Sequence, residues 1–282
     1  MIKSILLTTD FTSLSEYATE VAERIARQTG AKLNLLHVVN LPSHVLLDNQ
    51  GELLDDCEMD NSVPREKKEQ ALLKLNSWQQ NKDFESSVRV KFGNVNEESV
   101  KYACEVRADL IIMGSHGVHN YKDKITGSHT EWVAMHSSSP VLTIKSDEHG
   151  HDFRKIALVS AFQEDEIPNC NAALALQKTF GARICLLRIN TPDNFLADKD
   201  AIDHMKNFAK SHGIEGAEYH VYNANNVEEG ILRFAARESV DILMIGSHQR
   251  TGFSRFLQGC ISADLINHAE KPLLTFPIHV KK

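Results

Sequence analysis

The chain has 282 residues, of which 42% are hydrophobic and 24% charged, and its formal net charge at pH 7 is −7. This length and balance are typical of a globular protein with two domains. The acidic charge disfavours nucleic acid as a partner, because proteins that bind duplexes carry a basic face. No apolar run approaches the ~20 residues of a membrane-spanning helix, and the first residues form no signal-peptide core. We therefore expect a cytoplasmic protein that contacts no membrane.

In chain order, the first 145 residues alternate short apolar runs with amphipathic segments. Unbroken apolar runs predict strands covered on both faces, expected here over 5–9, 33–39, 88–92, 110–113 and 141–144. Amphipathic spacing predicts helices between the first two strands and over 65–81, 97–107 and 128–137. Ser13 and Glu16 fit a capping box for the first helix, and Gly30 fits its end. The segment 40–64 is acidic; we favour a solvated loop there over a lid above a site.

The same pattern returns in the second half of the chain. The segment that starts at Gly30 is matched at Gly181, 151 residues later, and the segment that starts at Asp109 is matched at Asp241, 132 residues later. The second copy is therefore 19 residues shorter (151 − 132) between its second and fourth strands. A duplication of this length predicts two domains, over 1–146 and 153–282. Strand–helix alternation in each predicts an open, mainly parallel, doubly wound sheet.

Glycine spacing after the fourth strand marks a candidate phosphate site. Gly114 and Gly117 are followed nine residues later by Gly127 and Ser128. Glycine allows backbone N–H groups to approach closely, and a helix N-terminus favours negative charge. Ligands of open α/β sheets bind outside the carboxyl ends of the strands, where the strand order reverses. If the first and fourth strands are neighbours there, Asp10 could accept hydrogen bonds from a ribose or base.

Other nucleotide and metal motifs are missing from the sequence. The chain has no P-loop and no Gly-x-Gly-x-x-Gly after its first strand. The five cysteines are scattered, with no Cys-x-x-Cys spacing, and are predicted to be reduced and mostly buried. His116 and His119 are three residues apart, but no cluster of Cys or carboxylates accompanies them, so we favour surface imidazoles over a metal site.

Taken with the repeat, these features resemble the universal stress protein family, in a tandem form with two such domains. The family signature Gly-x2-Gly-x9-Gly-Ser/Thr is matched at every position from Gly114 to Ser128, and the family's first- and second-strand endings resemble residues 8–12 and 36–38. The resemblance covers nearly the whole chain. It implies two Rossmann-like domains of the adenine nucleotide alpha hydrolase type, each a five-stranded, mainly parallel sheet with helices on both faces.

The resemblance also implies adenine-nucleotide binding by members that keep the glycines. By residue match, the adenosine would be lined by Thr8, Thr9, Asp10 and Val38. The phosphates would be surrounded by Met113, Gly114, His116, Gly117, Gly127, Ser128 and His129. In the second copy, Gln249 replaces the second glycine, Cys260 the hydroxyl residue and Ala161 the aspartate, so we expect that copy to have lost ATP binding.

We therefore expect a tandem universal stress protein that binds ATP or a related adenine nucleotide in its N-terminal domain, where Mg²⁺ could accompany the nucleotide. It would act as a regulator or scaffold, with no assigned catalytic residue and at most slow ATP hydrolysis. The alternatives are a nucleotide-free interaction module or small-ligand binder, a weak ATPase, and a relative of electron-transfer flavoproteins.

Family members pair domains through the last strand of each sheet. Here the segments 140–145 and 272–279 could pair within one chain, and whole chains could also form a homodimer. Because proline cannot donate a ladder hydrogen bond, Pro277 predicts that the second of these strands is edge-like.

Overall fold

The structure is a computed structural model. It describes residues 2–41, 47–48, 51–54, 62–80, 82–115, 129–145, 153–162, 166–168, 170–247, 265, 269 and 271–280.

The first half of the chain forms a parallel five-stranded sheet in the order β3-β2-β1-β4-β5. Its strands are β1 (Ser4–Thr8), β2 (Lys32–Val39), β3 (Ser86–Phe92), β4 (Leu110–Gly114) and β5 (Val141–Ile144). Its helices are α1 (Ser13–Thr29), α2 (Ser62–Gln79), α3 (Val95–Glu105) and α4 (His129–His136). Buried side chains of α1 and α2 share one core cluster, and those of α3 and α4 share another, so the two pairs cover opposite faces of the sheet.

The second half repeats this arrangement in the order β9-β8-β6-β10-β11, again with parallel neighbours. Its strands are β6 (Lys155–Val159), β8 (Arg183–Asn190), β9 (Glu218–Asn223), β10 (Ile242–Ser247) and β11 (Leu273–Val280). The described helices there are α5 (Asn171–Phe180), α6 (Asp198–His212) and α7 (Val227–Arg237). Two Rossmann-like α/β domains are thus confirmed.

Matching details show that the two halves are copies. The carboxylates of Asp109 and Asp241 each accept the backbone N–H groups that open β1 and β6, respectively. Asn94 and Asn226 each cap the following helix, α3 or α7, through the side chain. Asn94 also explains why α3 begins two residues before the expected start at 97.

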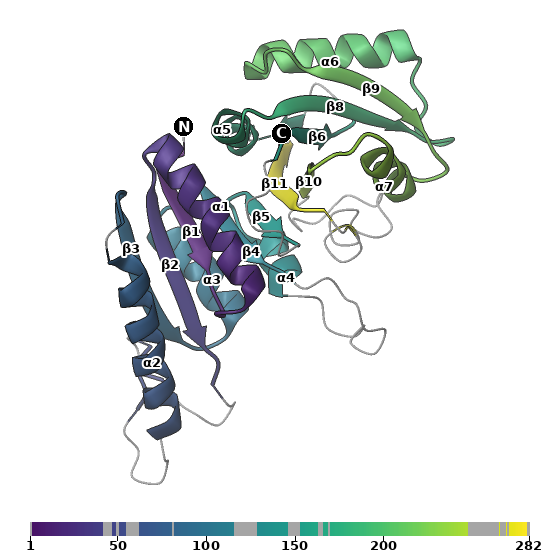
Figure 1. The fold of residues 1–282 in the computed structure, drawn as a ribbon. Coiled ribbons are helices and arrows are strands. Elements are labelled where there is room, and N and C mark those ends of the chain that lie inside the picture. The colour runs from purple at the N-terminus through teal and green to yellow at the C-terminus, as the bar shows by residue number, and fades with distance from the viewer. Residues whose placement is uncertain are drawn as a thin grey trace.

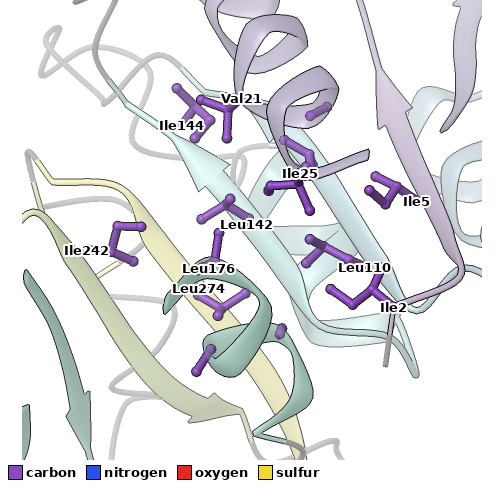
Figure 2. Close-up of a cluster of buried hydrophobic side chains, with 14 of the residues drawn as sticks. Ile2, Ile5, Val21, Ile25, Leu110, Leu142, Ile144, Leu176, Ile242 and Leu274 are labelled. Carbon is purple, nitrogen blue, oxygen red and sulfur yellow. The ribbon is translucent and has the colours of Figure 1, made fainter. Parts of the chain in front are cut away.

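The two sheets are continuous, because β5 lies antiparallel beside β11, with Leu142 opposite Leu274 (Figure 1). One core cluster runs across this joint. Figure 2 shows Ile144 beside Val21 of α1, and Leu142 and Leu274 between the two halves. The joint therefore buries apolar side chains from both halves in one cluster.

The expectation that Pro277 makes its strand edge-like is wrong. β11 lies between β10 and β5, and Pro277 is opposite Ser247 of β10. The pairing of β11 with β5 covers Leu273 to Thr275, and from Ile278 its partner on that side is the short strand β7 (Glu166–Pro168). Proline is tolerated because it falls between two successive partners.

The expected capping box of the first helix is also wrong by one residue. Thr12, not Ser13, is the N-cap of α1, and its side chain accepts the N–H of Ser15. Glu16 instead donates its backbone N–H to the carbonyl of Thr12. The end of the helix is as expected, because Gly30 has a φ of 71° and its N–H bonds to the carbonyl of Ala26.

The described part of the acidic insertion packs against the protein. Leu47 and Leu53 form an antiparallel bridge and contact the first core cluster. Lys68 of α2 forms an ion pair with Glu52. These described residues are half-buried or exposed, so the preference for a solvated loop over a lid stays a prediction.

Of the five cysteines, three lie in the described chain: Cys170 and Cys185 are buried and Cys104 is exposed. Burial raises the pKa of both buried thiols to about 12, which disfavours the reactive thiolate. Within the described helices, none is both long and apolar enough to cross a membrane. His116 and His119 lie outside the described residues.

Candidate functional site

The strand order of the first half reverses between β1 and β4, which are neighbours, with Thr8 opposite Met113. Both strands are parallel, so their carboxyl ends meet at one edge of the sheet. Thr9 and Asp10 follow β1 there, and Gly114 ends β4. The first and fourth strands are therefore neighbours at the reversal, as a crevice shared by Asp10 and the glycine motif requires.

Asp10 stands in a tight hydrogen-bonded turn between β1 and α1. Its Oδ1 accepts the backbone N–H of Thr12 at 3.1 Å and the Thr12 hydroxyl at 2.6 Å. Thr12 in turn caps α1, and the Ser15 hydroxyl donates to the Thr12 carbonyl at 2.9 Å. The turn therefore fixes an exposed carboxylate beside the positive end of a helix.

The environment of Asp10 favours its charged form. Partial burial acts to raise the pKa of this carboxyl, but the hydrogen bonds from the Thr12 side chain and backbone outweigh it and lower the pKa. An ionised acceptor at a strand end suits the hydroxyl groups of a sugar.

Phe11 connects this turn to β2 and α2. Its φ is 63°, a conformation that is uncommon for a bulky residue, and its N–H donates to Thr9 Oγ1 at 3.1 Å. The centroids of the Phe11 and His37 rings are 4.6 Å apart. Lys74 Nζ lies 4.7 Å from the centroid of the Phe11 ring. His37 Nδ1 is 2.8 Å from the carbonyl of Thr9, so the end of β1 is held against the end of β2.

His37 gives a pH-dependent prediction. Burial lowers its pKa, and the bond to the Thr9 carbonyl and the charge of Asp10 offset only part of that effect. Below the ordinary pKa of about 6.5, the unfolded chain then binds more protons than the folded one, so the free energy of unfolding falls as the pH falls through this window. We expect His37→Gln to reduce that loss, measured by urea unfolding between pH 5 and 8. Equal slopes for both proteins would contradict it.

Gly114 is required for packing as well as for its place in the motif. A Cβ at this position would lie 3.0 Å from the carbonyl carbon and oxygen of Leu14 and 3.1 Å from the Ser15 nitrogen. These are backbone atoms of the first turn of α1. The absence of a side chain at Gly114 therefore brings the end of β4 against the turn that holds Asp10.

The remaining expected site residues divide into two groups. Val38 is half-buried at the end of β2, and Met113 is buried in the cluster on the α3 and α4 face. His129 begins α4, with its Nδ1 2.6 Å from Asn96 Oδ1 of α3. Four expected residues lie outside the described chain: His116, Gly117, Gly127 and Ser128.

Comparisons with known proteins agree on one family. The model of the universal stress protein family matches residues 1–145 and again 154–277. The chain belongs to the universal stress protein family. A relative from Methanocaldococcus jannaschii, universal stress protein MJ0577, is 31% identical over 155 residues, which are 51% of this chain and 96% of that protein.

Solved structures share the two-domain arrangement. A universal stress protein from Archaeoglobus fulgidus aligns over 97% of this chain and 98% of its own, with a TM-score of 0.69 and 20% identity. A putative universal stress protein from Pseudomonas aeruginosa aligns over 98% and 94%, with a TM-score of 0.65 and 17% identity. At these identities the likeness establishes the fold.

The second universal stress protein domain keeps the strained turn but changes its chemistry. Phe162 has a φ of 54° and donates its N–H to Ser160 Oγ at 2.9 Å, as Phe11 does to Thr9. Ala161 stands where the first domain has Asp10. Gln249 and Cys260, on which we also based the expected loss of ATP binding, lie outside the described chain.

Sequence reasoning missed Arg188, which takes the place of His37 in the second domain. Its buried guanidinium donates to the carbonyl of Ala161 at 2.6 Å, to Asn194 Oδ1 at 2.9 Å and to Asn190 Oδ1 at 3.2 Å. These bonds tie the ends of β6 and β8 to the turn before α6. The 151-residue offset of the repeat could have drawn attention to this replacement.

Proposed function

We propose that the first domain of this universal stress protein binds ATP or a related adenine nucleotide, and that the chain acts as a regulator or scaffold rather than a high-turnover enzyme. The observation that carries the proposal is that β1 and β4 are neighbours where the strand order reverses, which puts Asp10 and Gly114 at the same edge of the sheet. The Gly-x2-Gly-x9-Gly-Ser spacing that begins at Gly114 supports it. Mg²⁺ could accompany the nucleotide.

Within this proposal the residues have separate roles. Thr8, Thr9, Asp10 and Val38 would line the adenosine, with Asp10 accepting from the ribose or base. Met113, Gly114 and His129 would lie at the phosphate end, together with the glycines and histidine of the loop. The second domain would be nucleotide-free, since Ala161 offers no carboxylate and Arg188 ties its strand ends together.

We further propose that the domains span 1–146 and 153–282 and that they pair within one cytoplasmic chain through β5 and β11. The antiparallel register of these strands supports internal pairing. A homodimer of whole chains could form in addition.

Substitution of Asp10 tests nucleotide binding. We expect Asp10→Ala to weaken ATP binding about tenfold or more, because a hydrogen bond to a charged group contributes about 1.5–3 kcal/mol. Asp10→Asn keeps an acceptor for Thr12 and should weaken binding without loss of stability. The measurement is titration of labelled ATP, with Gly117→Gln as a second site variant and the exposed Asp203→Asn as control. Equal weak binding by all proteins would favour the nucleotide-free interaction module.

Slow ATP hydrolysis is the second candidate activity. The motif histidine His116 is the group that would assist it. Phosphate release above background that is lost in His116→Ala would favour the weak ATPase.

A further inference from the structure

His37 lies beside the turn that carries Asp10, but it is not one of the expected nucleotide contacts. In β2 the side chain of Leu35 is buried in the cluster on the α1 and α2 face, whereas Val38 packs against the cluster on the α3 and α4 face. Because side chains alternate along a strand, His37 lies on the face of Leu35, where its ring meets that of Phe11. Any effect of His37 on binding would therefore pass through the turn.

The side chain of His37 adds a bond to the pairing of β1 with β2. The N–H of Thr9 donates to the carbonyl of Leu36 at 2.9 Å, and the carbonyl of Thr9 lies 2.8 Å from His37 Nδ1. Because a carbonyl can only accept a hydrogen bond, Nδ1 carries the proton here. Both backbone groups of Thr9 are thus fixed to β2, one by the backbone of that strand and the other by an imidazole.

Thr9 in turn anchors the strained part of the turn. Its Oγ1 accepts the N–H of Phe11 at 3.1 Å, and its hydroxyl donates to Ser15 Oγ at 3.1 Å. Phe11 has a φ of 63°, and a bulky residue keeps this conformation only where its surroundings hold it. Asp10 lies between Thr9 and Phe11, so the bonds that fix these two residues also fix the backbone that carries its carboxylate.

The second domain repeats this device with another side chain. Arg188 stands 151 residues after His37, at the matching place of β8, and its Nη1 donates to the carbonyl of Ala161 at 2.6 Å. The turn there has the same strain, since Phe162 has a φ of 54°. A side-chain donor at this strand position therefore accompanies the strained turn in both copies, although imidazole and guanidinium differ chemically.

We propose that His37 is a positioning residue for nucleotide binding, because its bond to the carbonyl of Thr9 keeps Asp10 aimed at the ribose or base. This inference rests on the proposed function of the first domain. His37 itself would not contact the nucleotide.

A double-mutant cycle tests this role by calorimetric titration of the whole chain with adenosine and with ATP. His37→Leu removes the donor, and we expect it to raise the Kd of both compounds about fivefold, because both contain the ribose and base. His37→Asn places an amide N–H near the position of Nδ1 and should stay within about twofold of wild type. In an Asp10→Ala background, His37→Leu should raise neither Kd further, because His37 acts through Asp10.

Amide hydrogen exchange measures the same turn without any ligand. The N–H groups of Phe11 and Thr12 are hydrogen-bonded within the turn, and both should exchange about fivefold faster in His37→Leu. His37→Asn should keep their exchange near the wild-type rate. The matched control is His220→Leu, which removes a half-buried histidine from β9 of the second domain and should change neither the Kd values nor these exchange rates.

Each result bears on the proposal. Wild-type Kd values for His37→Leu, or wild-type exchange of the turn amides in this variant, would overturn it. An equal rise in Kd with and without the Asp10 carboxylate would also overturn it, because it would show a general structural role. A wild-type chain that binds neither compound would overturn the proposed function and this inference with it, and faster exchange in His37→Leu would then show only that His37 holds the turn.

Discussion

Leu274→Ala, a substitution in the second domain, is expected to lower the stability of the first domain. Leu274 is fully buried opposite Leu142, and the cluster around them contains side chains from both halves (Figure 2). Removing a buried leucine side chain costs about 3–5 kcal/mol of unfolding free energy when the cavity cannot collapse. Because the sheet is continuous through this pair, we expect that loss to be shared by both domains.

The tryptophans allow the two domains to be observed separately. Trp78 and Trp132 are the two tryptophans of the chain, and both belong to the first half. In urea unfolding, their fluorescence reports that half, whereas far-UV circular dichroism reports both. Leu274→Ala should move both transitions to the same lower urea concentration. Leu73→Ala, at a position that is 71% exposed, is the control and should change the stability by less than about 0.5 kcal/mol.

Independent domains would give another result. The fluorescence midpoint of Leu274→Ala would stay at the wild-type value, and the circular dichroism curve would separate into two transitions. The joint between β5 and β11 would then contribute little to stability.

Much of the fold was predictable because each strand is a short apolar run buried on both faces. The repeat then predicted two domains, and the resemblance implied a five-stranded, mainly parallel sheet in each of them. The wrong predictions of fold details are at residues whose structure depends on partners that a local sequence pattern does not reveal. Pro277 was assigned to an edge because the sequence does not reveal that β11 changes partner from β5 to β7. The cap of α1 is Thr12 instead of Ser13, because Thr12 has extended backbone angles and its side chain accepts the N–H of Ser15.

For the candidate site, the sequence predicted the edge of the sheet at which it lies, and the binding roles of its residues stay predictions. That Asp10 and Gly114 lie at the same edge of the sheet followed from the general rule for strand-order reversal, because β1 and β4 are neighbours. Arg188 was missed because no motif includes it. Its role becomes visible only when it is compared with His37 at the matching position of the other copy.

Gly114→Val is the second substitution with a large expected effect. The Cβ alone would lie 3.0 Å from backbone atoms of Leu14, and the two methyl groups of valine need further space. Overpacking of this kind costs about 1–3 kcal/mol, and we expect Gly114→Ala at the low end and Gly114→Val at the high end or beyond. Urea unfolding of the two variants measures this order.

Nucleotide binding by the Gly114 variants should decrease together with their stability. The added side chain displaces the first turn of α1, which follows the turn that holds Asp10. Gly114→Val should weaken the binding of adenosine and of ATP alike. Shortening the Leu14 side chain should restore neither stability nor nucleotide binding, because the added Cβ contacts backbone atoms of Leu14 and Ser15. The double variant Gly114→Ala/Leu14→Ala tests this point. Recovery of stability in the double variant, or wild-type stability of Gly114→Ala alone, would show that α1 can move aside. Gly114 would then act only through the motif that it begins.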